Sequence, residues 1–277
     1  MFDFIANIFG YLLNFLYEIL NNYGIAIIIF SILVKLLLLP LTIKQQKTLE
    51  KTTKLQGELQ ALQFKYKNNP EQLNKEMMDM YKRENMTPFS GCLSSIIQII
   101  LILAVFYLVK SPLTYMKKVD SNIISNYTTK LETKTNYPEV QIVKEFGMEN
   151  EEVFINMEFL GLDLSSVPTS DFSDYKTLII PLLYVISSIA SMKITMNMQK
   201  NTNKEKEEKN VEKQEESPED IMKNTTKSMS YMMPVMAFSI SLVAPLGLAL
   251  YWLMSNVLMI AERILINLFM KKKEEEA

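Results

Sequence analysis

The chain has 277 residues, of which 48% are hydrophobic and 22% are charged, and its formal net charge is −2. It contains no histidine and a single cysteine, Cys92, which excludes a Ser-His-Asp or Cys-His triad, a histidine-ligated metal site and an intramolecular disulfide. The charges lie in blocks and the apolar residues in long runs, which together predict an all-α, polytopic membrane protein.

The first segment, residues 1–22, is predicted to be an N-terminal amphipathic helix that lies in the membrane interface as an anchor or lid. Large apolar side chains recur at mixed helical spacings between Phe2 and Leu16. There is no basic n-region and no small-residue cleavage site, so we expect no removable signal peptide.

The first membrane span is predicted at residues 23–43, and it contains a charge that such segments ordinarily avoid. Lys35 stands just past the middle of the apolar run, where a lysine costs about 2.5–3.5 kcal/mol on insertion scales. Snorkelling is one explanation, but the end of the span lies about 12 Å away and the side chain reaches about half that distance. We favour a water-filled cavity lined by Lys35, helped by Ser31 one turn earlier.

Residues 44–88 are predicted to form a helical hairpin, with helices at 44–66 and 71–84 joined by the turn-forming sequence KNNP. The segment is rich in lysine, so the positive-inside rule makes it cytoplasmic and the N-terminus extracellular. A solvated linker with helical tendency is the alternative, although regularly recurring apolar residues argue against it.

The rest of the chain supplies four more expected spans. The last apolar run, Tyr231 to Ala261, would extend roughly 46 Å as one helix, which exceeds the hydrocarbon core. Pro245 and Gly247 break it into two short spans, which keeps the basic C-terminal tail in the cytoplasm and should thin the bilayer locally. The expected segments are spans at 89–110, 176–196, 229–244 and 246–268, an acidic extracellular loop at 111–175, a charged cytoplasmic linker at 197–228 and a cytoplasmic tail at 269–277.

Several stretches in this order carry a resemblance to a known family. They are ILVKLLLLPLTIKQQK, LQGELQALQFKYKNNPEQLNKEMMDMYK, TPFSGCLSSIIQ, FLGLDLS, and MMPVM with PLGLALYWLMSN. Together they resemble the YidC, Oxa and Alb3 family of membrane protein insertases. The resemblance implies five transmembrane helices around a hydrophilic groove that opens to the cytoplasm and the lipid and is closed on the outer side.

The resemblance also implies site residues. Lys35 occupies the position of the family's characteristic cation, which is normally arginine; lysine keeps the charge but loses the planar fork. Ser191 and Trp252 should face the same groove, with Gln98 as a further candidate. Each has an alternative: Ser191 bonds back to its own helix, Gln98 holds helices together, or Trp252 belongs to an interfacial belt.

The implied mechanism is non-enzymatic and needs no cofactor, metal or ATP. A client's short hydrophilic tail, often acidic, enters from the cytoplasm and is stabilised by Lys35, and the client helix then partitions into lipid between the second and fifth spans. The expected contacts along that path are Ile97, Leu101, Val105, Leu248 and Trp252. The expected partners are newly made membrane proteins and the bilayer of a bacterial plasma membrane. Ribosome and Sec translocon contacts stay open, nucleic acid is not expected, and a monomer is the default.

Other classes of membrane protein fit less well. A small-solute or ion transporter would usually show repeats and carboxylates within its spans, and the apolar centres contain neither Asp nor Glu. An intramembrane protease would need a Ser-His or paired-Asp arrangement, which the spans do not contain. A non-inserting assembly scaffold remains an alternative, but it should not need a buried cation, so substitution of Lys35 separates it from an insertase.

Overall fold

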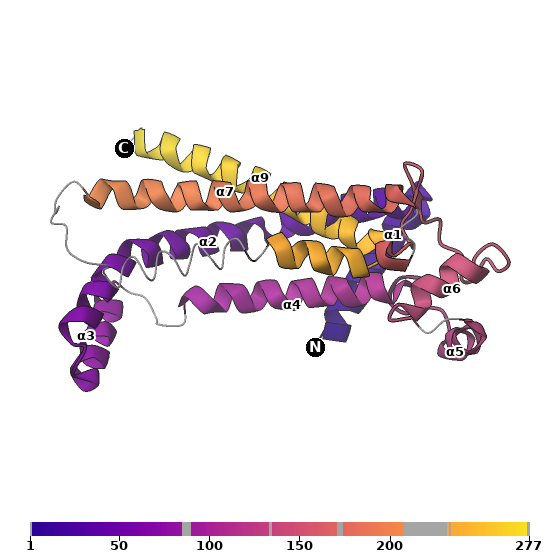
Figure 1. The fold of residues 1–277 in the computed structure, drawn as a ribbon, viewed down its shortest axis with the longest axis horizontal. Helices are drawn as coiled ribbons and strands as arrows, with labels where there is room; N and C mark the ends of the chain where they lie inside the picture. Colours follow the sequence, from indigo (N-terminus) through magenta and orange to yellow (C-terminus); the bar gives the residue numbers. More distant parts are fainter. Residues whose placement is uncertain are drawn as a thin grey trace. The chain divides into compact units, whose positions relative to one another are not determined.

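A computed structural model describes residues 2–84, 90–132, 135–170, 174–207, 232 and 234–275. These residues are almost entirely helical, apart from one two-stranded antiparallel hairpin (Figure 1). By length and composition, four described segments could each cross a membrane, and two further apolar helices are shorter. The long segments are Asp3–Leu20, Tyr23–Thr48, Tyr175–Met196 and Leu246–Ile266, and the shorter helices are Ile99–Lys110 and Pro234–Val243. The all-α, polytopic class predicted from sequence is therefore confirmed, whereas the number of five spans stays a prediction.

The chain divides into two compact units, and several long helices pass from one to the other. The first, which we call the bundle unit, comprises Met1–Leu37, Ile100–Ser191 and Met232–Ala277. The second, the hairpin unit, comprises Leu38–Ile99 and Met192–Tyr231. Each unit is described by itself.

The bundle unit buries one face of each of its long helices. It contains α1 (Phe2–Leu20), the first part of α2 (Tyr23–Lys65), the last part of α4 (Ser90–Lys110), the first part of α7 (Ile179–Glu207) and α9 (Leu246–Glu275). Its most deeply buried apolar side chains recur at helical spacing, which is the pattern expected when each helix turns one stripe inward. They include Leu13, Ile27, Phe30, Ala104, Leu108, Leu246, Leu248 and Ala249.

Helix α1 carries three stripes rather than the two of a simple amphipathic helix. Ala6, Phe9 and Leu13 belong to its buried apolar stripe. A second apolar stripe is exposed and consists of Phe4, Ile8, Tyr11, Phe15 and Ile19. The polar residues between them contact the π-helix η1 (Leu113–Lys117): the Tyr115 hydroxyl donates to Asp3 Oδ1 at 2.5 Å, and Lys118 donates to Asn7. An apolar stripe that stays exposed is expected for a helix that lies next to lipid.

One end of the bundle unit, which we call the loop end, is closed by backbone hydrogen bonds between distant segments. The stretch FLGLDLS forms strands β1 (Glu158–Phe159) and β2 (Leu162–Asp163), joined by a tight turn in which Leu160 and Gly161 both have positive φ. Just after this hairpin, the carbonyls of Leu164 and Ser166 accept from the Gly247 and Leu246 N–H groups at 2.9 Å each. These donors open α9 and would otherwise lack helical partners, so the hairpin segment caps α9.

The same segment also holds the start of α2. The Tyr23 N–H donates to the Asn156 carbonyl at 3.0 Å. A Cβ on Gly24 would stand 2.5 Å from the Phe159 ring, so glycine permits this close approach. Helices α2 and α9 therefore both begin at the loop end and run away from it in the same direction.

The described part of the segment between α4 and α7 also contains short helices. They are α5 (Ser121–Lys130), α6 (Pro138–Phe146) and the short 3-10 helices η2 (Pro168–Ser170) and η3 (Tyr175–Leu178). The rings of Tyr127 and Phe146 pack with their centroids 5.0 Å apart and join α5 to α6. This segment showed no strong periodicity in the sequence, because its helices are short.

The hairpin unit contains the continuation of α2 and helix α3 (Pro70–Arg83). Helix α2 does not end at residue 43; it continues to Lys65 through Pro40, which removes only one backbone donor. Asn69 then caps α3 by accepting from the Gln72 N–H at 3.1 Å. Arg83 Nη2 donates to both oxygens of Glu58 at 2.9 Å, which joins the C-terminal end of α3 to α2.

Two of the expected segments outside the spans are partly helical. Helix α7 continues to Glu207, so the first part of the expected linker at 197–228 is helical. Helix α9 continues to Glu275, so most of the expected tail at 269–277 is helical as well. The break predicted at Pro245 to Gly247 is present, since one helix ends at Val243 and the next begins at Leu246.

Candidate functional site

The charge that stands out in the sequence, Lys35, is paired inside the bundle unit. Lys35 Nζ donates to Glu262 Oε2 at 3.4 Å and so joins α2 to α9. The lysine side chain is 22% exposed and the glutamate side chain 7%. Both partners lie within helical segments long and apolar enough to cross a membrane. The structure thus accommodates the cation by pairing it with a buried carboxylate.

Helix α2 presents Lys35 inward because of its two-sided pattern. Ser31 and Val34 continue the buried stripe that begins at Tyr23 and Ile27. Leu36 and Leu37, on the other side, are 60% and 73% exposed. Lys35 lies at the border between these faces, which lets its ammonium reach a neighbouring helix.

The other partner, Glu262, was missed in the sequence because it comes directly after the apolar run that ends at Ala261. Its side chain is buried on the face of α9 that also carries Tyr251 and Ile266. The expectation that the apolar spans contain no carboxylate is therefore wrong for the last span, Leu246–Ile266. A signal was present: a lysine within a span calls for a counter-charge, and Glu262 is the acidic residue that borders the final run.

A second group of polar and aromatic contacts joins α9 to α7. Asn256 Nδ2 donates to Ser188 Oγ at 2.7 Å and to Ser187 Oγ at 3.4 Å. One turn earlier on α9, the ring of Trp252 stacks on that of Tyr184 with centroids 5.9 Å apart. Sequence reasoning named Trp252 but missed Asn256, which lies one helical turn later on the same face.

The remaining predicted groove residues have different surroundings. Ser31 is buried and donates back to the Ile27 carbonyl at 2.7 Å, so its hydroxyl is engaged within its own helix. Ser191 is 6% exposed and takes part in contacts of its own. The side chain of Gln98 lies outside the described part of the chain.

The predicted client contacts differ in exposure. Val105 and Leu248 are 1% and 0% exposed, so both belong to the core of the bundle unit in this state. Leu101 and Trp252 are half-buried, and the side chain of Ile97 lies outside the described residues. Contact of Val105 or Leu248 with a client would need their helices to move apart, and the client path stays a prediction.

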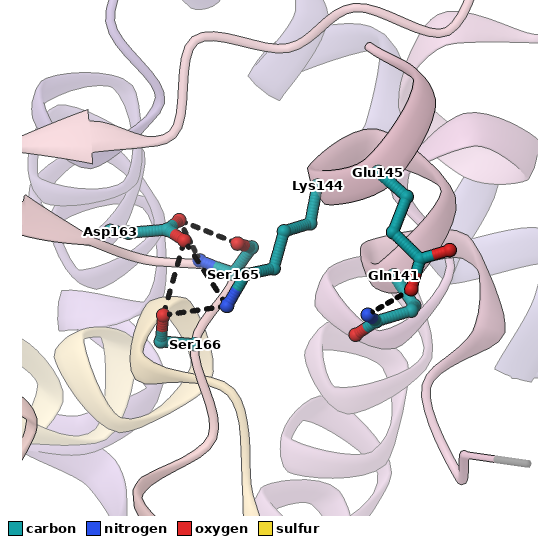
Figure 2. Close-up of polar contacts among 6 residues, drawn as sticks. All are labelled: Gln141, Lys144, Glu145, Asp163, Ser165 and Ser166. Atoms are coloured by element: carbon teal, nitrogen blue, oxygen red, sulfur yellow. Dashed lines mark hydrogen bonds and ion pairs between the residues drawn. The ribbon is translucent and has the colours of Figure 1, made fainter. Parts of the chain in front are cut away.

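The loop end is reinforced by polar side chains near its β-hairpin. Figure 2 shows Lys144 of α6 pointing toward Asp163, beside Ser165 and Ser166. Lys144 Nζ lies 3.6 Å from Asp163 Oδ2 and donates to Ser166 Oγ at 3.2 Å. Ser165 Oγ donates to Asp163 Oδ1 at 2.5 Å. These contacts hold the segment that caps α9.

A buried carboxylate also fixes η1 to α6. Glu139 accepts from the Thr114 N–H at 2.9 Å and from the Thr114 hydroxyl at 2.7 Å. Burial raises the pKa of Glu139 above its usual value, although the donated hydrogen bonds oppose that change. The carboxylate thus acts as a cap that is supplied from a distant helix.

Comparisons with known proteins agree on one family. A family model described as "60Kd inner membrane protein" matches residues 15–274. A protein named "Membrane protein insertase YidC" from Treponema denticola is 26% identical over 268 residues, which cover 97% of this chain and 38% of the relative. Its namesake from Chloroherpeton thalassium is 28% identical over 254 residues, covering 92% of this chain and 34% of the relative. A third, from Fusobacterium nucleatum, is 36% identical over 111 residues, covering 40% of this chain and 54% of the relative. The chain thus spans about a third to a half of the length of these relatives.

Proposed function

Because this chain belongs to the 60Kd inner membrane protein family, we propose that it is a membrane protein insertase and chaperone. Family membership and its long apolar helices support a multi-pass protein of a bacterial membrane. The clients are newly made membrane proteins, and the bilayer is the medium into which their apolar helices partition. This partition supplies the driving force, so the protein acts without ATP and is not an enzyme.

The observation that carries this proposal is the cation at Lys35, held within helices that are long enough to span the membrane. Lys35 lies 12 residues after Tyr23, the first residue of α2, which is about 18 Å along the helix from the loop end. A positive charge at this depth can stabilise the carboxylates of a client tail part-way across the membrane. It lowers the cost of moving such a tail through an apolar layer.

The protein has one orientation in the membrane. We propose that the loop end is the outer face, residues 44–88 lie in the cytoplasm, and five spans leave the N-terminus outside and the C-terminus inside. The closed backbone contacts at the loop end support this direction, because a client would then enter from the opposite side. Ser191, Trp252 and Asn256 extend the site along α7 and α9.

The test uses purified full-length protein in proteoliposomes and a small single-span client with an acidic translocated tail. Protease protection of the tail measures insertion by the wild type, by Lys35→Arg and by a neutral double variant, Lys35→Met with Glu262→Gln. The double variant removes the cation without leaving a buried charge unpaired. We expect Lys35→Arg to retain insertion and the double variant to lose at least about tenfold. Wild-type insertion by a folded double variant would contradict the role of Lys35, whereas no insertion by the wild type would contradict the insertase function.

A transporter of ions or small solutes is a second candidate, because a paired lysine and glutamate within membrane-spanning helices is also a feature of transport pathways. The same proteoliposomes discriminate the two functions. Flux of small ions without client insertion would favour a transporter, whereas insertion without flux favours an insertase. Client binding without insertion would identify an assembly scaffold.

A further inference from the structure

The Lys35–Glu262 pair is asymmetric in a way that bears on how a client reaches the lysine. Lys35 makes contact with only one oxygen of the carboxylate, Oε2, at 3.4 Å. The other oxygen, Glu262 Oε1, is buried and has no hydrogen-bond partner among the described residues. A charge-assisted N–H to carboxylate bond is ordinarily about 2.7–2.9 Å long, so this pair is loosely formed.

Access to the two partners also differs. The lysine side chain is 22% exposed, whereas the glutamate side chain is 7% exposed. A lysine ammonium carries three donors, of which Glu262 engages one. A second carboxylate can therefore approach Lys35 from its open side before Glu262 is displaced.

Glu262 has the same functional group that an acidic client tail would offer. When a client carboxylate binds Lys35, the two carboxylates share one cation and repel one another. Arg263, the next residue, is half-buried and its charge interacts with that of Glu262, while Lys35 donates a hydrogen bond to Glu262 Oε2. The resident carboxylate must consequently weaken the binding of each client carboxylate.

We propose that Glu262 is an internal competitor for Lys35 and sets which client tails the site accepts. This inference rests on the proposed function and names a specificity-determining residue within it. Glu262 keeps the empty site neutral, makes weakly acidic tails poor clients, and returns to Lys35 when a client leaves, which favours release. Clients with several carboxylates displace it most readily because they supply more than one competing charge.

The experiment compares one client span carrying tails with zero, one or three acidic residues, in the proteoliposome assay described above. The proteins are the wild type, Glu262→Gln, Glu262→Asp and the surface control Glu158→Gln, whose native side chain is exposed. For Glu262→Gln, we expect insertion of the one-acid tail to rise at least about fivefold relative to the neutral tail. Glu262→Asp keeps the charge, so it and Glu158→Gln should retain the wild-type order of preference.

Two outcomes would overturn the inference. If Glu262→Gln lowers the insertion of all three tails in the same proportion, the pair is a structural strut between α2 and α9. If Glu262→Asp shifts the preference as much as Glu262→Gln does, packing rather than charge is responsible. A thermal unfolding midpoint for each variant in the same lipid separates loss of fold from loss of preference.

The neutral double variant keeps this test distinct from the test of the proposed function. If the double variant still inserts acidic clients, Lys35 is not the receiving cation, and the competitor role of Glu262 fails while the insertase function stands. If the double variant is inactive but Glu262→Gln shows the wild-type order, the insertase site stands and only the competitor role is overturned.

Discussion

The bundle unit and the hairpin unit each use a basic residue and a glutamate to join two helices, but the two ion pairs have different surroundings. Lys35 and Glu262 are 22% and 7% exposed, whereas Arg83 and Glu58 are 59% and 49% exposed. The hydrogen-bond distances have the opposite order: the exposed pair has two contacts of 2.9 Å, and the buried pair has a single contact of 3.4 Å. Good hydrogen-bond geometry therefore does not identify the pair that matters more, because burial sets the cost of leaving a charge alone.

Loss of the buried ion pair in the bundle unit should have the greatest effect on stability. Lys35→Ala leaves the buried Glu262 carboxylate without its hydrogen-bonded cation and should destabilise the protein by about 3–5 kcal/mol. The neutral double variant, Lys35→Met with Glu262→Gln, should recover most of that loss because no charge remains unpaired. The fluorescence of Trp252, the only tryptophan in the chain, reports unfolding of the bundle unit in lipid or detergent. A double variant as unstable as Lys35→Ala would show that the pair's charge is not the cause.

The same substitution in the two units should have opposite signs. A Cβ at Gly10 of α1 would lie 1.9 Å from the Tyr115 carbonyl oxygen, so Gly10→Ala should force α1 and η1 apart and cost about 1–3 kcal/mol. Gly57, in the hairpin unit part of α2, has nothing within 4 Å of such a Cβ. Gly57→Ala should therefore stabilise its helix by about 0.5–1 kcal/mol. Thermal unfolding of both variants measures this difference, and equal signs would contradict it.

A smaller effect concerns the buried carboxylate at the loop end. Burial raises the pKa of Glu139 above its usual 4.5, so the folded protein holds this proton more tightly than the unfolded chain. Stability should then be greatest below pH 4.5 with respect to this group and should fall as pH rises through the raised pKa. Glu139→Gln should remove this loss while costing roughly 1 kcal/mol at low pH through weaker hydrogen bonds. Unfolding midpoints from pH 4 to pH 8 check the difference between the two proteins, and parallel curves would refute it.

Loss of the exposed ion pair in the hairpin unit should have little effect on stability. Glu58→Gln removes the partner of Arg83 in the hairpin unit, where solvent and salt screen the charge. We expect little change in the unfolding midpoint, and none at high salt. A loss comparable to that of Lys35→Ala would mean that the hairpin pair is far less solvated in the working protein than its exposure indicates.

Much of the fold could be predicted because the signals are local. The apolar run around Lys35, the turn formers at KNNP and the break at Pro245 each depend on residues that are neighbours in the sequence. The helix predicted at 44–66 continues the first span without a break in α2, because the lysine- and glutamine-rich segment after the span is also a good helix former. The short helices α5 and α6 carried too few turns for a periodic pattern.

The candidate site was predicted in part. Lys35 and Trp252 were identified, but their contacts with Glu262 and Tyr184 were not. Ser31 lies next to the site in the sequence, yet its hydroxyl is used within its own helix. Asn256 was missed because a single amide at the end of a resembling stretch carries no signal until its partners on α7 are known.

Local patterns of residues were enough to identify a polytopic helical membrane protein with one cation inside a long apolar run, because hydropathy, charge and helix breaking act over a few neighbouring residues. The packing of distant helices sets which group pairs with that cation. Lys35 and Glu262 are 227 positions apart, and they meet because the loop end fixes the starts of α2 and α9 together and sends both helices in the same direction. Pairing across such a distance depends on how helices pack, which no local pattern of residues specifies.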